Sequence, residues 1–491
     1  MPDRSAGSLV IAARLCRTTA LSNAASSWTP STDPFGLQSD HRFDTVFGTH
    51  YSLPMGYRSR RSRRILAGAV AAAVLVTGSL SAAALPIPSA PGFGVPTYVG
   101  APSTAAPVSS FAVPQNPFMA PNGTNNIHDD AYATDSYAGA GPRGRAPAVN
   151  STFYGVDECA TMTFDSLGRI VGLCIDTAGP KLKLINPTSL AVISSHALPG
   201  RDITSGKNPL TDLCGGAYFY LDNHDRAVVA TTKRTIEVIA ETGSSFALQR
   251  TFDVTSAVPD SDCLIALMPD WSGRIWFVSS KGVVGDIDPT TGAVKSLTLA
   301  GEIIDNSFAT DETGGVFIAS DHAMYRFDVD TAGAPVVTWR QTYDRGTVKK
   351  PGQLAQGTGT TPTLVGSDYV AITDNADPRM NVLVYRRGRT SGGALVCGAP
   401  VFTAGKSDTE NSLVAVGDSL FVENNFGYTS PASTLLGATT TPGLARVDFT
   451  ADGHCTNVWT SQQIAPTSVA KASLANGLLY AYTKPKNALL I

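Results

Sequence analysis

Three groups of acidic and amide side chains in this sequence are spaced closely enough to bind a cation or a polar ligand. The first group is Asp374, Asn375 and Asp377, in the stretch TDNADPRMN that follows the apolar run YVAI. Carboxylate and amide oxygens are the ligands that a hard cation such as calcium prefers. The same residues would also form an Asx turn ending at Pro378, without a metal. We favour the turn and keep calcium as the alternative.

The second group consists of two Glu-Asn pairs that flank one expected hairpin. These pairs would place carboxylate and amide oxygens near the base of the hairpin, where they could bind a sugar, a cation or the metal of a quinone cofactor. Asn-rich loops that satisfy their own backbone groups are the alternative. The candidate residues are Glu410, Asn411, Glu423, Asn424 and Asn425.

The third group lies in the stretch NNIHDDAYATDSY, which contains His128, Asp130 and Tyr132. Side chains alternate between the two faces of a strand, so these three residues would share one face if the stretch is a strand. His128 and Asp130 would then form a charge-assisted pair or ligate a metal. We favour a polar first strand at the edge of a sheet, because no second pair of ligands completes a metal site.

Linear motifs of common enzymes are absent from the sequence. It contains no G-x-S-x-G, no P-loop and no H-E-x-x-H stretch. A Ser/His/Asp triad assembles from distant positions, so the sequence leaves a triad open. We predict a binding or scaffolding protein rather than an enzyme, with a small molecule, a glycan or a protein as its ligand.

An export signal explains where the basic residues concentrate. Residues 55–84 contain an arginine-rich flank, an uncharged apolar run from Ile65 to Leu80 and a segment of small residues, the order of a secretory signal peptide. Residues 65–85 are also about long enough to remain as a membrane anchor. Both the general and the twin-arginine export routes stay open. We predict an extracellular, periplasmic or cell-envelope protein that contacts a membrane only through this segment.

The regions on either side of this signal are predicted to lack a packed core. Residues 1–54 show no sustained periodicity, which predicts a disordered extension or a mis-called start upstream of Met55. Residues 85–120 are rich in Pro, Ala and Ser, which predicts an extended linker. Acidic residues outnumber basic ones after residue 84, so no basic stripe points to a nucleic-acid partner.

Export also bears on the cysteines, because an oxidising compartment favours disulfides. With Cys16 set aside, six cysteines remain, which predicts three disulfides: Cys159, Cys174, Cys214, Cys263, Cys397 and Cys455. In ECATMTFDSLGRIVGLC a regular hairpin would place Phe164 opposite Arg169 and Cys159 opposite Cys174, with cysteine α-carbons roughly 4.5–5.5 Å apart. Pairing of Cys159 with Cys214 across repeats is the alternative, since both follow similar acidic steps.

The mature chain has the periodicity of an all-β repeat protein. From about residue 121, apolar β-branched runs alternate with turns such as DSLG, DNHD and DWSG, at intervals of roughly 40–60 residues with four strands each. We predict a β-propeller over 121–491, with seven or eight four-stranded blades, in preference to a stack of β-sandwiches. The last blade is expected to be incomplete. Either a strand near Ile127–Tyr132 completes it, or Ile491 is an unnatural end.

The turns DIDPTTGAV (286–294) and DVDTAGAPVVTW (328–339) resemble the D-x-x-T-G-x-x-x-W repeats of quinoprotein-dehydrogenase-like propellers. Residues 125–491 as a whole resemble exported propellers of that superfamily. The resemblance implies a propeller fold and, as an alternative function, oxidation that depends on pyrroloquinoline quinone (PQQ) and calcium. However, the chain lacks the vicinal Cys-Cys pair that such dehydrogenases share, and the Thr-Gly-Trp motif recurs only in fragments. Oxidation is therefore the second choice after ligand binding at the channel mouth.

Overall fold

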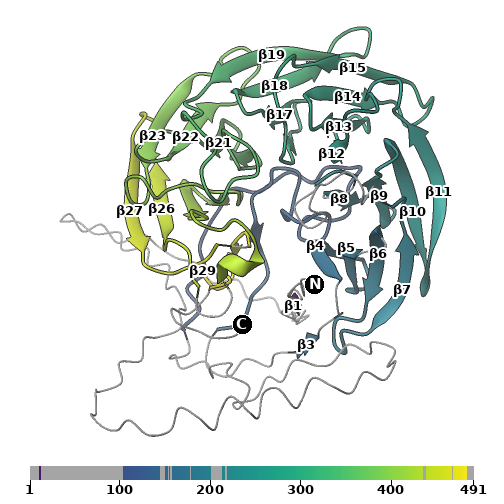
Figure 1. The fold of residues 1–491 in the computed structure, drawn as a ribbon, viewed down its shortest axis with the longest axis horizontal. Helices are drawn as coiled ribbons and strands as arrows, with labels where there is room; N and C mark the ends of the chain where they lie inside the picture. Colours follow the sequence, from purple (N-terminus) through teal and green to yellow (C-terminus); the bar gives the residue numbers. More distant parts are fainter. Residues whose placement is uncertain are drawn as a thin grey trace, which may run out of the picture.

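Mainly antiparallel sheets arranged in a ring make up the structure (Figure 1). This computed structural model describes residues 10–12, 103–143, 150–152, 154, 157–176, 179–200, 213–215, 218–434, 438–466 and 468–483. The predicted export signal at 55–84, the possible anchor at 65–85 and Cys16 lie outside these residues. Within the described ranges, no helix is both long and apolar enough to span a membrane.

Six blades are four-stranded, and in each the strands follow one another in chain order from the channel to the outer edge. We number the blades in chain order. Blade one contains β4 (Glu158–Phe164), β5 (Ile170–Asp176), β6 (Gly179–Ile185) and β7 (Val192–Ala197), and blade two contains β8 (Phe219–Leu221), β9 (Arg226–Ala230), β10 (Thr235–Thr242) and β11 (Ser245–Asp253). Blade three contains β12 (Leu264–Pro269), β13 (Ile275–Ser279), β14 (Val283–Ile287) and β15 (Val294–Thr298), and blade four contains β16 (Ala309–Thr310), β17 (Val316–Ala319), β18 (Ala323–Val329) and β19 (Pro335–Thr342). Blade five contains β20 (Thr363–Val365), β21 (Tyr369–Thr373), β22 (Asn381–Arg386) and β23 (Leu395–Pro400), and blade six contains β24 (Val414–Val416), β25 (Ser419–Glu423), β26 (Leu444–Phe449) and β27 (Cys455–Ser461).

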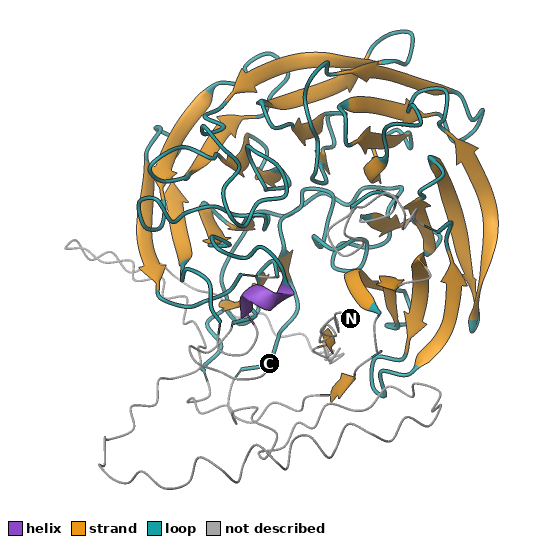
Figure 2. Ribbon diagram, in the orientation of Figure 1, coloured by secondary structure: helices purple, strands orange, loops and turns teal. Residues whose placement is uncertain are grey.

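Blade seven has three strands among the described residues. β28 (Lys471–Ser473) and β29 (Leu478–Tyr480) form a hairpin, and β2 (Ser136–Tyr137) adds to it in parallel. A separate pair consists of β1 (Val10–Ala12) and β3 (Asn150–Thr152), and the short helix η1 covers Pro431–Thr434 (Figure 2). The prediction of an all-β propeller is confirmed, and the described residues form seven blades, of which the last has three strands.

Burial follows the position of a strand in its blade. β12 and β13 are buried at every residue, because neighbouring blades cover both faces of the inner strands. The outermost strand β27 alternates between half-buried and exposed residues, because its outer face meets solvent. The apolar runs that follow the predicted turns are the second strands of the blades, such as β5, β9 and β13.

An aspartate shapes the turn between the first two strands in blades one to four. Asp270 is typical: its Oδ1 accepts hydrogen bonds from the backbone N–H of Ser272 at 2.8 Å and of Arg274 at 3.1 Å. This arrangement is an Asx turn. The equivalent residues in the other three blades are Asp165, Asp222 and Asp311.

Residues 119–137, which we call the central segment, run inside the ring and bond to the inner strands. Carbonyls of this segment accept hydrogen bonds from inner-strand N–H groups in four successive blades, with N···O distances of 2.8–2.9 Å. The donor and acceptor pairs are Thr310 to Ala131, Leu364 to Tyr132, Ala415 to Thr134 and Ala472 to Asp135. The carbonyls can turn toward successive blades because Ala133 and Asp135 both have a φ of 55°.

This path corrects the prediction of a strand near Ile127–Tyr132. That stretch forms turns, so His128, Asp130 and Tyr132 do not share a strand face. The strand that completes the last blade is β2, a few residues further along. Sheet pairing begins only there because the carbonyls of the preceding residues serve several different blades.

Residues 103–118, which the sequence analysis assigns to a linker, pack on the blades without regular secondary structure. The N–H of Val108 donates to the carbonyl of Leu474 at 2.9 Å, and the amide of Asn116 donates to the carbonyl of Pro269 at the same distance. This part of the chain therefore contacts the ring, and the start of the propeller domain at residue 121 stays a prediction.

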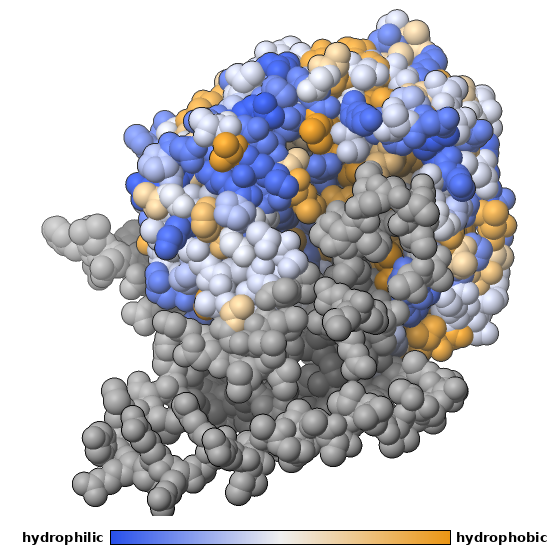
Figure 3. Space-filling model, in the orientation of Figure 1, coloured by the Kyte–Doolittle hydropathy of each residue, from blue (hydrophilic) through white to orange (hydrophobic). Residues whose placement is uncertain are grey.

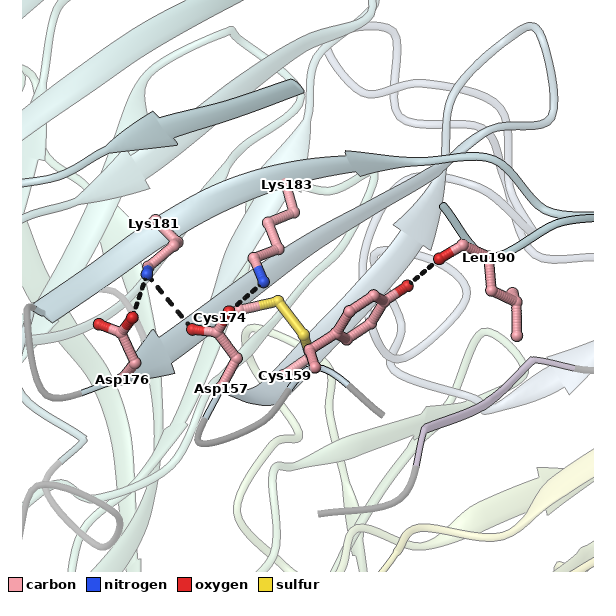
Figure 4. The surroundings of a disulfide bond; sticks show 8 residues. Asp157, Cys159, Cys174, Asp176, Lys181, Lys183 and Leu190 are labelled. Atoms are coloured by element: carbon pink, nitrogen blue, oxygen red, sulfur yellow. Dashed lines mark hydrogen bonds and ion pairs between the residues drawn. A yellow bond between two sulfur atoms is a disulfide. The ribbon is translucent and has the colours of Figure 1, made fainter. Parts of the chain in front are cut away.

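The three disulfides include the predicted hairpin bond. Cys159 pairs with Cys174 across β4 and β5, with α-carbons 3.8 Å apart, closer than expected (Figure 4). The predicted register is wrong nearer the turn, where Phe164 lies opposite Ile170 rather than Arg169. A bulge between Cys159 and Thr161 takes up the one-residue difference and restores the register at the cysteines.

The other two disulfides join neighbouring blades. Cys214 and Cys263 precede the inner strands of blades two and three, and Cys397 and Cys455 lie on the outer strands of blades five and six. Around the hairpin disulfide, Lys181 forms ion pairs with Asp157 and Asp176, as Figure 4 shows. Covalent bonds thus act both within a blade and between blades.

Peptide mapping of the non-reduced protein tests this connectivity. We expect three cross-linked peptides, joining Cys159 to Cys174, Cys214 to Cys263 and Cys397 to Cys455. A peptide that joins Cys159 to Cys214 would contradict the blade assignment of the first two repeats.

Replacement of Ala133 tests the conformation of the central segment. Ala133 is fully buried and has a φ of 55°, which a β-branched residue adopts only with strain. We expect Ala133→Val to lower the free energy of unfolding by about 3 kcal/mol through strain and overpacking. Ala133→Gly is the matched control and should change it by about 1 kcal/mol or less, because glycine adopts this φ readily. Equal losses for both variants in guanidinium denaturation would argue against this backbone conformation.

Candidate functional site

His128 lies inside the ring and contacts Asp135 rather than the predicted Asp130. Its Nδ1 is 3.1 Å from Asp135 Oδ2, and both side chains are buried. The other oxygen of Asp135 accepts a hydrogen bond from Lys471 of β28, whose ammonium also donates to the carbonyl of Ile127 at 2.6 Å. This ion-paired group ties the central segment to blade seven.

Asp130 folds the central segment back on itself. Its carboxylate accepts hydrogen bonds from the N–H of Tyr132 at 2.9 Å and from the hydroxyl of Thr134 at 2.6 Å. Burial raises the pKa of Asp130 to about 7, the bonds from Thr134 act in the opposite direction, and Asp135 raises it further. Asp130 is thus a turn-forming residue.

A hydroxyl completes a row of three side chains that the sequence did not reveal. Thr361 Oγ1 lies 3.4 Å from His128 Nε2, so Thr361, His128 and Asp135 are aligned like a nucleophile, a base and its orienting acid. Thr361 is only 1% exposed, which keeps a substrate from its hydroxyl. The row therefore anchors the central segment to blade five.

The Glu-Asn residues do come together at the base of the blade-six hairpin, as predicted. The side-chain amide of Asn425 bonds to two backbone groups. Its Oδ1 accepts a hydrogen bond from the N–H of Glu410 at 2.6 Å, and its Nδ2 donates to the carbonyl of Pro466 at 2.5 Å. Asn424 similarly donates to the carbonyl of Lys406. These two amides hold backbone groups, in line with the alternative that we kept open.

Glu423 differs from these amides, because half of its carboxylate has no partner. Oε2 accepts a hydrogen bond from Asn411 Nδ2 at 2.6 Å, but Oε1 is buried without a hydrogen bond. Burial raises the pKa of Glu423 well above its usual value, the bond from Asn411 and the charge of Lys471 lower it, and Asp135 raises it. Glu423 therefore belongs to the same electrostatic group as Asp135.

Glu410 interacts with residues from other parts of the ring. Its Oε1 accepts the N–H of Leu354 at 2.7 Å, from the long connection between blades four and five. Burial raises the pKa of Glu410 to about 8, and the nearby carboxylates of Asp305 and Asp408 raise it further. Burial also raises the pKa of Tyr218, with added contributions from Glu410 and Asp305. We call Tyr218, Asp305 and Glu410 the acidic mouth.

The acidic mouth continues into the interior of the ring. The ring of Tyr218 stacks on that of His128, with centroids 6.2 Å apart. The carboxylate of Asp135 also acts on Tyr218. Sequence reasoning missed Tyr218 and Asp305, since they lie in different repeats from Glu410 and carry no local motif.

Asp408 is a further residue that the sequence analysis missed. Both of its carboxylate oxygens are buried without a hydrogen bond. Burial raises its pKa to about 7, although Lys350 lowers it. The signal that could have pointed to it is its place two residues before Glu410, in the polar stretch between β23 and β24.

The three residues of the possible calcium site each make different contacts. Asp374 accepts hydrogen bonds from the N–H of Ala376 at 3.2 Å and of Asn381 at 2.6 Å, as an Asx turn requires. Asn375 donates its amide to backbone carbonyls, and Asp377 is half-exposed with Lys350 3.4 Å away. These contacts fit the turn, and calcium here stays a prediction.

The face of the propeller in Figure 3 mixes hydrophobic and hydrophilic side chains over its described part. Exposed apolar residues such as Leu167, Val348 and Leu395 come from different blades or connections. These exposed apolar residues therefore do not come from one blade.

Comparisons with known proteins add a distant relative. The chain is 28% identical over 255 residues to an uncharacterized protein of Archaeoglobus fulgidus, a match that covers 44% of this chain and 49% of the relative. The chain thus aligns with about half the length of that curated relative. No family model matches the chain.

Several solved propellers show a weak structural likeness. The β-propeller domain of Cps50 (Swd1) from Myceliophteria thermophila has a TM-score of 0.35 and 12% identity, with 65% of this chain and 96% of that domain covered. The Dos1 propeller has a TM-score of 0.42 and 9% identity, with 66% and 74% covered. These values are too low to carry an argument about function, and the quinoprotein resemblance stays a prediction.

The buried carboxylates predict how stability changes with pH. Asp130, Asp408 and Glu410 have pKa values raised to about 7, 7 and 8, so between about pH 5 and 8 the folded state holds protons that the unfolded state releases. We therefore expect the free energy of unfolding to fall as the pH rises through this range. Urea denaturation at pH 5.5 and 8.5 measures the change.

Asp408→Asn isolates one of these groups. The variant should be more stable than the wild type at pH 8.5 and similar to it at pH 5.5, because it removes a buried charge that no hydrogen bond compensates. If the free energy of unfolding depends equally on pH in the variant and the wild type, Asp408 does not contribute to this pH dependence.

Proposed function

We propose that this protein is an exported binding or scaffolding protein whose ligand presents a positively charged group to the acidic mouth. The propeller fold supports a binding role, because residues from several blades converge on one axis. Here Tyr218 comes from blade two, Asp305 from the connection into blade four and Glu410 from the connection into blade six.

One observation supports a positively charged ligand: carboxylates gather inside the ring with few cations to balance them. Asp129, Asp135, Glu410 and Glu423 act on one another or on shared neighbours, while Lys471 is the nearby ammonium that bonds to the central segment. Asp129 Oδ1 and Glu423 Oε1 are both buried without a hydrogen bond. A cationic group near the mouth would favour the ionised form of these carboxylates, whose pKa values burial raises.

The remaining support concerns location. Three disulfides are consistent with an oxidising compartment outside the cytoplasm. The tripartite order of residues 55–84 points to export of the chain. We therefore place the binding role in the periplasm, at the cell envelope or outside the cell.

A thermal-shift panel on the purified mature protein tests this function. The panel contains guanidinium, quaternary ammonium and polyamine compounds, neutral glycans and divalent cations. We expect the cationic organic compounds to raise the melting temperature, and to do so more at pH 9 than at pH 6.5, because Glu410 ionises fully only above about pH 8. Glu410→Gln should remove most of the shift, while Glu237→Gln on the half-buried surface of blade two should keep it.

Three results would count against the proposal. A flat response to every cationic compound at both pH values would exclude the acidic mouth as a cation site. A shift that persists in Glu410→Gln would place binding elsewhere. Dye reduction that requires added PQQ and calcium would instead support the oxidoreductase alternative.

A further inference from the structure

A second cluster of acidic residues lies where blade one meets blade two, away from the channel mouth. Asp165 comes from the β4–β5 turn, Asp225 from the β8–β9 turn and Glu241 from the end of β10. Each offers one carboxylate oxygen, and these three oxygens lie within 4.8 Å of one another. Three chain segments that are distant in sequence thus bring three negative charges to one point.

Hydrogen bonds fix two of these carboxylates in place. Asp165 Oδ1 accepts the N–H of Leu167 at 3.0 Å and of Arg169 at 2.7 Å, as part of its Asx turn. Asp225 accepts from Ser166, whose hydroxyl is 2.7 Å from Asp225 Oδ2. The turns of the two blades therefore hold the acidic side chains in a defined arrangement.

Glu241 supplies an oxygen that no group of the protein satisfies. Its Oε2 accepts a hydrogen bond from Arg169 Nη2 at 2.7 Å, but its Oε1 is buried without a hydrogen-bond partner. The side chain of Glu241 is only 3% exposed. An ionised carboxylate in this position needs a cation or a proton beside it.

The local charge balance favours a divalent cation. Three carboxylates and the guanidinium of Arg169 leave two negative charges in the cluster. Carboxylate oxygens are the ligands of hard cations, and calcium takes further oxygens from water. Asp225 is half-exposed, which leaves an access route for water and for the ion.

We propose that Asp165, Asp225 and Glu241 form a binding site for a divalent cation of the calcium type. This site is separate from the acidic mouth and does not depend on the function proposed above. It is also distinct from the turn at Asp374, the calcium candidate in the sequence analysis.

The position of the site gives the cation a structural role. Backbone bonds from the central segment reach blade two and blades four to seven, and the inter-blade disulfides join blades two to three and five to six. The acidic cluster joins blade one to blade two. A cation there would fix the first blade to the rest of the ring.

A shared proton is the competing way to satisfy Glu241. Burial raises the pKa of Glu241 to about 8, a hydrogen bond shared with Asp165 and the charges of Asp165 and Asp225 raise it further, and Arg169 lowers it. A proton and a cation would compete for the same oxygen. Cation binding should therefore be tighter at pH 9 than at pH 7.

Isothermal titration calorimetry of the chelator-treated mature protein with calcium chloride tests the proposal. We expect binding of one calcium ion and a calcium-dependent rise in melting temperature, both stronger at pH 9. Glu241→Gln keeps the size of the side chain but removes its charge, and should weaken binding by at least roughly tenfold. Asp225→Asn should do the same, since asparagine tolerates the φ of 61° at this position.

Two control variants make the outcome specific. Glu237→Gln, on the same strand and outside the cluster, should bind calcium like the wild type. Asp374→Asn should also leave binding unchanged. Loss of binding in Asp374→Asn, with normal binding in Glu241→Gln, would overturn the proposal. A second result would also overturn it: the wild type binds no calcium at either pH, and Glu241→Gln raises the melting temperature at pH 9 whether or not calcium is present.

Discussion

The structure depends on the bonds between the backbone of the central segment and the inner strands of the blades. An inner strand has one edge without a partner in its own sheet, and an N–H group buried there needs an acceptor. Four residues between 131 and 135 supply acceptors to blades four, five, six and seven. This arrangement requires a left-handed backbone at Ala133 and Asp135, because alternating strand geometry would direct the carbonyls differently.

The acidic interior follows from this arrangement. Turning the segment at each blade uses short polar side chains that bond to the local backbone, and so Asp130 and Asp135 are buried inside the ring. Asp135 is balanced by Lys471 and faces His128, but Asp129 and Glu423 each keep an oxygen without a partner. The segment that holds the blades together thus also places acidic side chains inside the ring.

Local patterns in the sequence predicted much of the fold. Apolar runs separated by Asp- and Gly-containing turns gave the blades, because each hairpin is formed by neighbouring residues. The Cys159–Cys174 bond was predictable for the same reason, although the bulge next to Cys159 was not. The inter-blade disulfides and the path of residues 103–137 were not predictable, because the residues that bind them lie in distant blades.

The candidate site shows the same division. Glu410, Asn411 and Glu423 were found because they flank one hairpin, whereas Tyr218, Asp305 and Asp135 reach the channel from other parts of the chain. His128 was assigned the wrong acidic partner, since the prediction assumed a strand where the chain turns toward successive blades. Spacing along the chain therefore identified groups within one blade but not groups that the ring brings together.

Hydrogen–deuterium exchange at residue resolution tests most directly whether the central segment holds the ring together. The amides to compare are those of Thr310, Leu364, Ala415 and Ala472, which face the channel and donate to the central segment. We expect them to exchange as slowly as the amides inside the β13–β14 ladder, because their bonds would break only when the ring opens. Exchange at the rate of solvent-exposed turn amides, with the ladder still protected, would contradict this account.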